Sequence, residues 1–426
     1  MMISETLIVN LLIILSAAWL LGYIFSRFGL PVMLGELMAG LILGPALLDV
    51  VHSSEQIELL ADLGIFFVMF YAGMEMDPRL LLAHIRPALA TALGGFVLPF
   101  VMGYFTTRVF GGTVFQALFV GMGLSVTAIA VQAVILQNLR IHHSNIGHII
   151  MGAAIADDIF SLVTLGVLLG LAKSGVVEPV AILMLLGKVV LFFGFTIVVG
   201  EFVMPRLTPH LTDSGGKAFT FAMIVALVMA FLAEKAGLHL VIGAFLAGQF
   251  VRREIMDQRI YELLNDRFYS ISYGFLTPIF FATLGFQLAF TWTGEFIALA
   301  CALTAVAILG KVLGCGLGAK LTGQDTTEAL VVGIGMNGRG AVELVIASVV
   351  IQLSDQLLAS GVIREPLLTP NQFSALVFMA FVTTIMTPII LKWLVVRSCS
   401  SADGAAFCAL WDQGDSEEFR AEKGME

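Results

Sequence analysis

Two adjacent acidic residues, Asp157 and Asp158, lie near the middle of a long apolar segment of the chain. A charged side chain inside a membrane span costs about 3 kcal/mol on insertion scales, so a carboxyl group at that depth requires an explanation. No lysine or arginine lies within several helical turns of the pair along the chain. A structural ion pair or a helix cap is therefore the weaker explanation, and the pair is a candidate ion site.

The chemistry that this pair favours is competition between a cation and a proton. Burial of a carboxylate and repulsion by its neighbour both favour the protonated form, whereas a bound cation favours the ionised form. Consecutive helical residues point about 100° apart, so the two carboxylates face different neighbours while sharing one cavity. Competition for the same oxygen atoms is sufficient for exchange if the unloaded carboxylates do not cross the membrane easily.

A third charge at membrane depth is Lys311, which follows Gly310 in another apolar segment. It lies too far from either end for its ammonium group to reach the headgroup region comfortably. Its natural partner is one of the two aspartates, most simply Asp157, which leaves Asp158 to hold the cation. The lysine either exchanges a proton itself or only locks two helices together, and both readings stay open.

Two further apolar segments contain glycines and polar residues at membrane depth. One runs from Gly121 to Ala128 and includes Ser125 and Thr127; the other runs from Gly333 to Glu343 and includes Asn337 and Arg339. Such sequences are typical of discontinuous helices whose half-helix ends point at a transport site, although close helix packing is an alternative for the glycines. We expect the Thr127 hydroxyl and exposed carbonyls to complete the oxygen shell of the cation.

Several other polar residues have a simpler interpretation. Arg339 and Glu343 are four residues apart, so a mutual pair that neutralises the broken helix is expected, and with Ser125 and Asn337 they are at most supporting residues of the site. Glu75 is expected to line a vestibule or a packing contact. The histidines at 142, 143 and 148 are placed where a pH sensor would be useful, but solvated loop histidines are common.

The composition indicates the elements that hold these residues. Hydrophobic residues make up 59% of the 426 residues and charged residues 12%, whereas soluble globular proteins are roughly half apolar and a quarter charged. The sequence predicts an all-α polytopic membrane protein, because its apolar segments are long enough to cross a ~30 Å hydrocarbon core. Thirteen helices are expected, at 5–26, 31–49, 59–76, 87–108, 114–138, 146–171, 179–204, 217–236, 238–251, 270–290, 293–320, 327–352 and 372–396.

Charge distribution predicts the orientation of these helices. Thirteen Lys and Arg residues fall towards one side of the bundle and four towards the other. Since basic residues accumulate on the cytoplasmic side, the N-terminus is expected outside and the C-terminus inside. The broken helices then run in opposite directions, which predicts an inverted repeat relating helices 4–6 to helices 11–13. Residues 1–397 form the expected transmembrane domain, and 398–426 an acidic cytoplasmic tail.

Short motifs along nearly the whole chain resemble those of the monovalent cation:proton antiporter-2 family, bacterial sodium/proton exchangers with an NhaA-like fold. The order and spacing of the motifs carry the resemblance: Gly29 to Glu36 with Gly40 and Gly44-Pro45, Ser125 to Ala128, Asp157-Asp158, Leu246-Ala247-Gly248 and Gly310-Lys311.

The resemblance implies a homodimer in the bacterial inner membrane. Helices within 87–171 and 293–396 would form a mobile core, and those within 5–76 and 179–290 a scaffold with the dimer interface. It implies Asp158 as the main cation ligand, Asp157 as its proton-carrying neighbour paired with Lys311, and Thr127 in the unwound crossing.

The resemblance also implies a substrate and a stoichiometry. The expected activity is electrogenic exchange of two protons for one sodium ion, without a cofactor. A potassium/proton antiporter of the same fold is the alternative. The chain departs from the potassium-efflux branch because only about 30 residues follow Arg397, too few for a nucleotide-binding domain.

Two other classes of protein explain the same residues less well. An intramembrane aspartyl protease needs its two acids to share a proton across a ~3 Å gap, which adjacent positions on one helix do not readily allow. A cation channel would line a continuous pore with rings of carbonyls or acids, whereas here the acids lie on one helix. The sequence therefore favours a carrier and predicts no enzymatic activity and no nucleic-acid partner.

Overall fold

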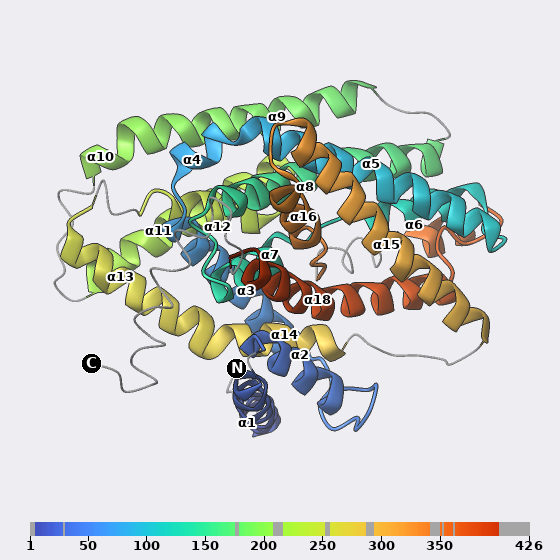
Figure 1. The fold of residues 1–426 in the computed structure, drawn as a ribbon, viewed down its shortest axis with the longest axis horizontal. Helices are drawn as coiled ribbons and strands as arrows, with labels where there is room; N and C mark the ends of the chain where they lie inside the picture. The colour runs from blue at the N-terminus through green and yellow to red at the C-terminus, as the bar shows by residue number, and fades with distance from the viewer. Residues whose placement is uncertain are drawn as a thin grey trace. The chain divides into compact units, whose positions relative to one another are not determined.

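A computed structural model of the 426-residue chain describes residues 5–28, 30–174, 179–207, 216–251, 256–286, 294–340, 350–351, 353–360 and 363–399 (Figure 1). The regular structure in these residues is entirely helical, as the apolar composition predicts. The chain forms two compact units. Unit 1 comprises Met1–Asp77 and Ser161–Trp292, and unit 2 comprises Pro78–Phe160 and Thr293–Glu426.

Unit 1 contains eleven helical elements in the described residues. They are α1 (Glu5–Arg27), α2 (Val32–Leu43), α3 (Glu55–Glu75), α9 (Pro179–Val198), the π-helix η1 (Val199–Val203), α10 (Met204–Leu207), α11 (Lys217–Ala236), α12 (Leu240–Gly248), α13 (Gln258–Ile271), the π-helix η4 (Ser272–Leu276) and α14 (Thr277–Phe286).

Unit 2 contains the helices that carry the expected ion site. They are α4 (Pro78–Ala83), α5 (Ile85–Val109), α6 (Val114–Ser125), α7 (Ile129–Asn138), α15 (Gly294–Leu321), α16 (Thr326–Gly335) and α18 (Pro370–Cys399). The long helix α8 (Asn145–Ser174) begins in unit 2 and continues into unit 1.

Ten segments of the described chain are helical, long enough and apolar enough to cross a membrane. The remaining three expected positions hold shorter helices, α2, α12 and α16. The nine residues of α12 span roughly 14 Å, about half of a hydrocarbon core. Ten spans are thus supported by length, while thirteen membrane crossings remain a prediction.

Glycines let the helices of unit 1 approach one another closely. A Cβ atom on Gly40 of α2 would collide with the backbone of Ala282 on α14. Gly73 of α3 is similarly in contact with the backbone of Phe245 on α12. Each pair of helices therefore packs backbone to backbone, a mode common among membrane helices.

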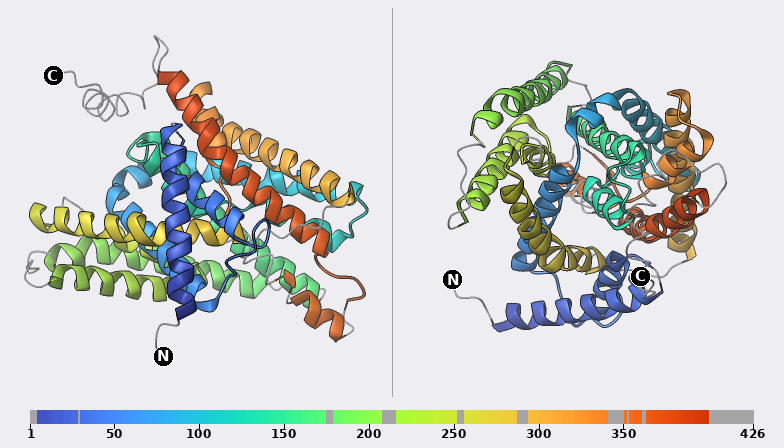
Figure 2. Two further views of the ribbon diagram at one scale, coloured as in Figure 1. Left: turned by 90° about the horizontal axis from the view of Figure 1, so that it is seen from below. Right: turned by 60° about the vertical axis from the view of Figure 1, so that its left-hand side comes forward.

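In unit 2, α5 packs along α15, and α15 also contacts α16 and α18. Figure 2 shows α15 and α18 running alongside each other. Gly94 on α5 and Gly314 on α15 face each other so closely that a Cβ atom on either would collide with the other's carbonyl group. This crossing positions the segment of α15 that carries Lys311, three residues before Gly314.

Gly314→Ala is therefore expected to lower the thermal stability of the purified protein. Overpacking of a tight contact costs about 1–3 kcal/mol, and here the obstructing atoms belong to backbone that cannot rotate away. Thermal unfolding in detergent measures the effect. Gly166→Ala, in α8 where a Cβ atom meets nothing within 4 Å, is the matched control. Equal thermal midpoints for the two variants would show that the α5–α15 contact has room for the added methyl group.

Candidate ion-binding site

The first expected broken helix is present in the structure. Helix α6 ends at Ser125 and α7 begins at Ile129. Val126 and Ala128 between them have extended backbone, with ψ of 144° and 106°. The Ser125 hydroxyl lies 2.8 Å from the carbonyl oxygen of Phe96 on α5, so the end of α6 is tied to its neighbour. Thr127 therefore lies in a non-helical segment at membrane depth, as predicted.

The second broken helix meets the first. Helix α16 ends at Gly335, and the residues up to Gly340 are not helical. The Gly338 carbonyl oxygen accepts hydrogen bonds from the Ala128 backbone nitrogen (3.2 Å) and from Gln132 Nε2 (3.3 Å). Backbone groups in a membrane interior need a partner inside the protein. The two interruptions therefore satisfy part of each other's hydrogen-bonding requirement.

Lys311 joins one aspartate to the first interruption. Its Nζ atom lies 2.9 Å from Asp157 Oδ2 and 2.6 Å from Thr127 Oγ1. Asp157 and Thr127 therefore bind the same ammonium group. The side chains of Lys311 and Asp157 are fully buried. The predicted partner of Lys311 is thus confirmed, and the three side chains form a closed group.

Asp158 lies outside this closed group. It is the next residue of α8 and is only 4% exposed. Its Oδ1 atom has no hydrogen-bond partner within the described part of the chain. A buried carboxylate that is neither paired nor hydrogen-bonded is strongly disfavoured in its charged form. Asp158 is therefore the carboxyl group for which a proton or a cation would provide the missing partner.

Arg339 holds the two interruptions together through the backbone. Its Nη2 atom donates to the carbonyl oxygen of Leu124 in the last turn of α6, at 2.6 Å. Its own backbone N–H donates to Thr384 Oγ1 on α18 at 3.2 Å. A cation at a helix C-terminus is favoured by the partial negative charge there. The expected partner Glu343 lies outside the described residues, so this pairing stays a prediction.

Asn337, the other supporting residue on the second interruption, bonds within its own turn. Its Nδ2 atom donates to the carbonyl oxygen of Gly333 at 3.0 Å, and the residue is only 3% exposed. Ser125, which also donates to the Gly121 carbonyl oxygen at 2.9 Å, and Asn337 therefore both use polar side chains to stabilise the ends of the interrupted helices.

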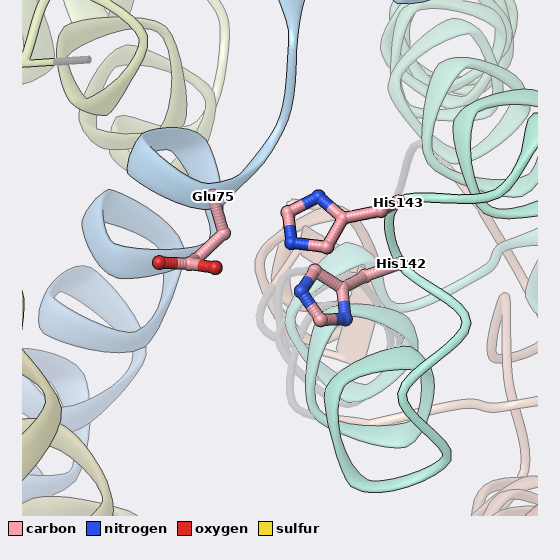
Figure 3. A group of neighbouring side chains, drawn as sticks. All are labelled: Glu75, His142 and His143. Atoms are coloured by element: carbon pink, nitrogen blue, oxygen red, sulfur yellow. The ribbon is translucent and has the colours of Figure 1, made fainter. Parts of the chain in front are cut away.

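Glu75 and the two consecutive histidines are drawn in Figure 3. Glu75 ends α3 in unit 1 and accepts hydrogen bonds from Tyr261 and Asn265 of α13. His142 and His143 follow α7 in unit 2, with ring centroids 4.0 Å apart. His142 is largely buried, whereas His143 is exposed. The expectation of a solvated histidine loop is therefore wrong for His142, whose ring is covered by the protein, and for His148, which is 1% exposed within α8.

Sequence reasoning missed Gln132, which binds the second interruption from α7. It is completely buried and lies in the apolar sequence from Ile129 to Leu136. The available signal was a polar side chain at membrane depth, the same criterion that selected the aspartates.

The long apolar helices, the two interrupted helices in contact and the buried ion pair are features of a polytopic membrane protein. The chain belongs to the sodium/hydrogen exchanger family, whose transmembrane region matches residues 11–397. This is a family of transporters, so the chain is a multi-pass transport protein and not an enzyme.

Similar proteins cover almost the whole chain. The Na(+)/H(+)-K(+) antiporter GerN of Bacillus cereus is 32% identical over 383 residues, which cover 89% of this chain and 94% of GerN. The Na(+)/H(+) antiporter of Enterococcus hirae is 29% identical, covering 91% of this chain and 97% of that protein. The sodium proton antiporter MjNhaP1 of Methanocaldococcus jannaschii has a similar fold, with a TM-score of 0.69 at 19% identity over 92% of this chain and 96% of that one.

Proposed function

We propose that the protein is a sodium/proton antiporter in which Asp158 binds a cation and a proton alternately. The observation that carries this proposal is the different environment of the two adjacent carboxyl groups. Asp157 is paired with Lys311 at 2.9 Å, whereas Asp158 Oδ1 is buried without a hydrogen-bond partner in the described residues. The names of the similar proteins support sodium, and that of GerN makes potassium the second candidate.

The proposed cycle follows from this charge arrangement. A sodium ion displaces the proton of Asp158, and the loaded site becomes accessible from the other side of the membrane, where a proton displaces the ion. When sodium also draws the Asp157 carboxylate away from Lys311, the unpaired ammonium group gives up a second proton, and Lys311 regains a proton when the ion leaves and the pair forms again. Two protons would thus move against one cation, and net charge would cross the membrane.

We also propose the finer architecture that the resemblance implies: thirteen crossings, inverted repeats, an NhaA-like fold and membership of the antiporter-2 branch. One support is that α6 and α16 begin alike. Thr113 and Gln116 form a capping box at the start of α6, and Asp325 and Glu328 form one at the start of α16. Both helices then end at an interruption, which is what two related halves would produce.

The proposed division into a mobile core and a scaffold follows the two compact units. All the described site residues belong to unit 2, which would be the core, and unit 1 would supply the scaffold and the homodimer interface. The proposed location is the bacterial inner membrane with the N-terminus outside. The acidic segment 398–426 would then lie in the cytoplasm.

Reconstitution into liposomes tests the proposed exchange. Sodium, lithium and potassium are offered separately while internal pH and membrane potential are recorded together. Sodium-driven proton movement, with a response to membrane potential, is the expected result. Proton movement with potassium alone would favour the second candidate. Currents far above carrier rates would indicate a channel.

Thr127→Ala is expected to raise the apparent KM for the cation about threefold to tenfold, with a smaller effect on the maximal rate. One neutral oxygen contributes modestly to a site, and the lost contact to Lys311 leaves its pair with Asp157 less well oriented. Thr127→Ser keeps the hydroxyl and should behave like the wild type. An unchanged KM in Thr127→Ala would mean that this interruption serves packing or motion and not binding.

A further inference from the structure

The nitrogen and the oxygen of the Gln132 side-chain amide have different surroundings at the contact between the two interrupted helices. Its Nε2 atom donates to the carbonyl oxygen of Gly338 at 3.3 Å. Its Oε1 atom is buried and has no hydrogen-bond partner among the residues that the structure describes. The acceptor at Gly338 fixes the orientation of the amide, because only the nitrogen can donate to a carbonyl. The oxygen must therefore face away from that bond.

Asn337 on the other interrupted helix repeats this arrangement. Its Nδ2 atom donates to the carbonyl oxygen of Gly333, and its Oδ1 atom is buried with no partner in the described ranges. Burying an amide oxygen without a hydrogen bond is unfavourable. The two oxygens belong to the two interrupted segments, which the bond from Gln132 to Gly338 joins next to Asn337.

The charged residues of the site indicate which kind of ligand would bind there. Gln132 lies five residues after Thr127 on the same interrupted segment, and Thr127 contacts Lys311, which neutralises Asp157. Asp158 is then the acidic group of this region without a basic partner in the described residues. One negative charge with neutral amide oxygens suits a monovalent cation, because oxygen ligands replace its hydration shell without excess charge.

We propose that Gln132 is a cation ligand of the transport site, with Oε1 acting beside Asn337 Oδ1 and the Asp158 carboxylate. The inference rests on the proposed antiport. It assigns to Gln132 a role in the selectivity of the site among monovalent cations. The amide nitrogen keeps the oxygen in place by its bond to Gly338. A residue with only this clamping role would hold the two helices together without distinguishing one cation from another.

The test compares Gln132→Leu and Gln132→Asn with the wild type in liposomes, using sodium, lithium and potassium separately. Gln132→Leu removes the oxygen and should raise the KM for sodium about tenfold, the upper end for one neutral contact. Gln132→Asn draws the oxygen back by about one carbon–carbon bond, roughly 1.5 Å, and should shift the preference towards the larger potassium ion. Gln137→Leu, the same change at a half-buried position of α7, is the control and should keep wild-type values.

A clamping role makes a different prediction. Both variants would lose thermal stability, and every KM would change by the same factor, leaving the cation preference unchanged; that result would overturn the proposal. A sodium KM within twofold of the wild type in folded Gln132→Leu would also overturn it. If the leucine variant does not fold, the cation preference of Gln132→Asn decides.

Cation-dependent thermal stabilisation in detergent gives a readout that does not require exchange. A wild type that is stabilised by sodium but moves no protons would contradict the proposed antiport, yet Gln132→Leu should still weaken the stabilisation. Stabilisation by sodium that is equal in the wild type and in Gln132→Leu would contradict the ligand role alone. The two failures are therefore distinguishable.

Discussion

Asp158→Asn is expected to abolish cation-driven proton movement while leaving the protein folded. An amide has nearly the same shape as the carboxyl group, but it neither attracts a cation as a carboxylate does nor exchanges a proton. Asp158 Oδ1 makes no hydrogen bond with the described residues, so the substitution removes no described contact. Internal pH in liposomes measures the loss, and the thermal midpoint checks the fold.

Asp266→Asn supplies the control for this substitution, since Asp266 is exposed on α13. It should exchange normally. Asp157→Asn should also impair transport, but by leaving Lys311 without its carboxylate, so direct cation binding should suffer less than in Asp158→Asn. The opposite order of cation affinities would exchange the roles of the two aspartates, and substantial exchange by Asp158→Asn would remove Asp158 from the mechanism.

Lys311→Gln is expected to exchange one proton per cation and to lose its response to membrane potential. A membrane potential supplies ~2.3 kcal/mol per 100 mV for each net charge moved, so an electroneutral cycle has no such driving force. The variant lacks the bond of 2.9 Å to Asp157, and losing one partner of a buried pair costs about 3–5 kcal/mol. A lower thermal midpoint is therefore also expected.

Lys320→Gln is the matched control on the same helix. Lys320 is exposed near the end of α15 and bonds to Thr326 at 2.8 Å. Its substitution should leave the response to membrane potential intact. A folded and active Lys311→Gln protein that still moves net charge would refute the proton-carrying role and leave the lysine as a structural lock.

The charged residues of the site could be predicted because the membrane interior leaves them few explanations. A lysine and two aspartates at depth need partners or a function, and the pairing of Lys311 with Asp157 followed from that requirement. The interruption at Thr127 could also be predicted, since glycines and hydroxyl side chains weaken a helix and can satisfy its freed backbone groups.

Contacts between distant positions could not be predicted in the same way. Thr127 was expected to face the cation, but its hydroxyl binds Lys311, which is 184 positions away in the sequence. Gln132 bonds to a glycine 206 positions away, and one glutamine among apolar residues gives no sign of that distance. Hydropathy specifies which residues are buried, whereas their partners depend on how the helices pack.

Hydropathy alone could not predict the number of membrane crossings either. The apolar segment expected at 238–251 contains a helix of only nine residues. Its composition is apolar because it is buried among other helices, with eight of its residues, Val241 to Gly248, covered. Burial in protein and burial in lipid select the same residue types, so composition alone does not separate a short packed helix from a complete crossing.

Proton release on cation binding tests the central claim, that a cation and a proton compete at Asp158. Sodium chloride is added to the purified protein in weakly buffered detergent solution, and the change in pH is followed against choline chloride at equal ionic strength. The wild type should release protons on addition of sodium, and Asp158→Asn should release none. No release from a wild type that binds sodium, or equal release from the two proteins, would contradict the account.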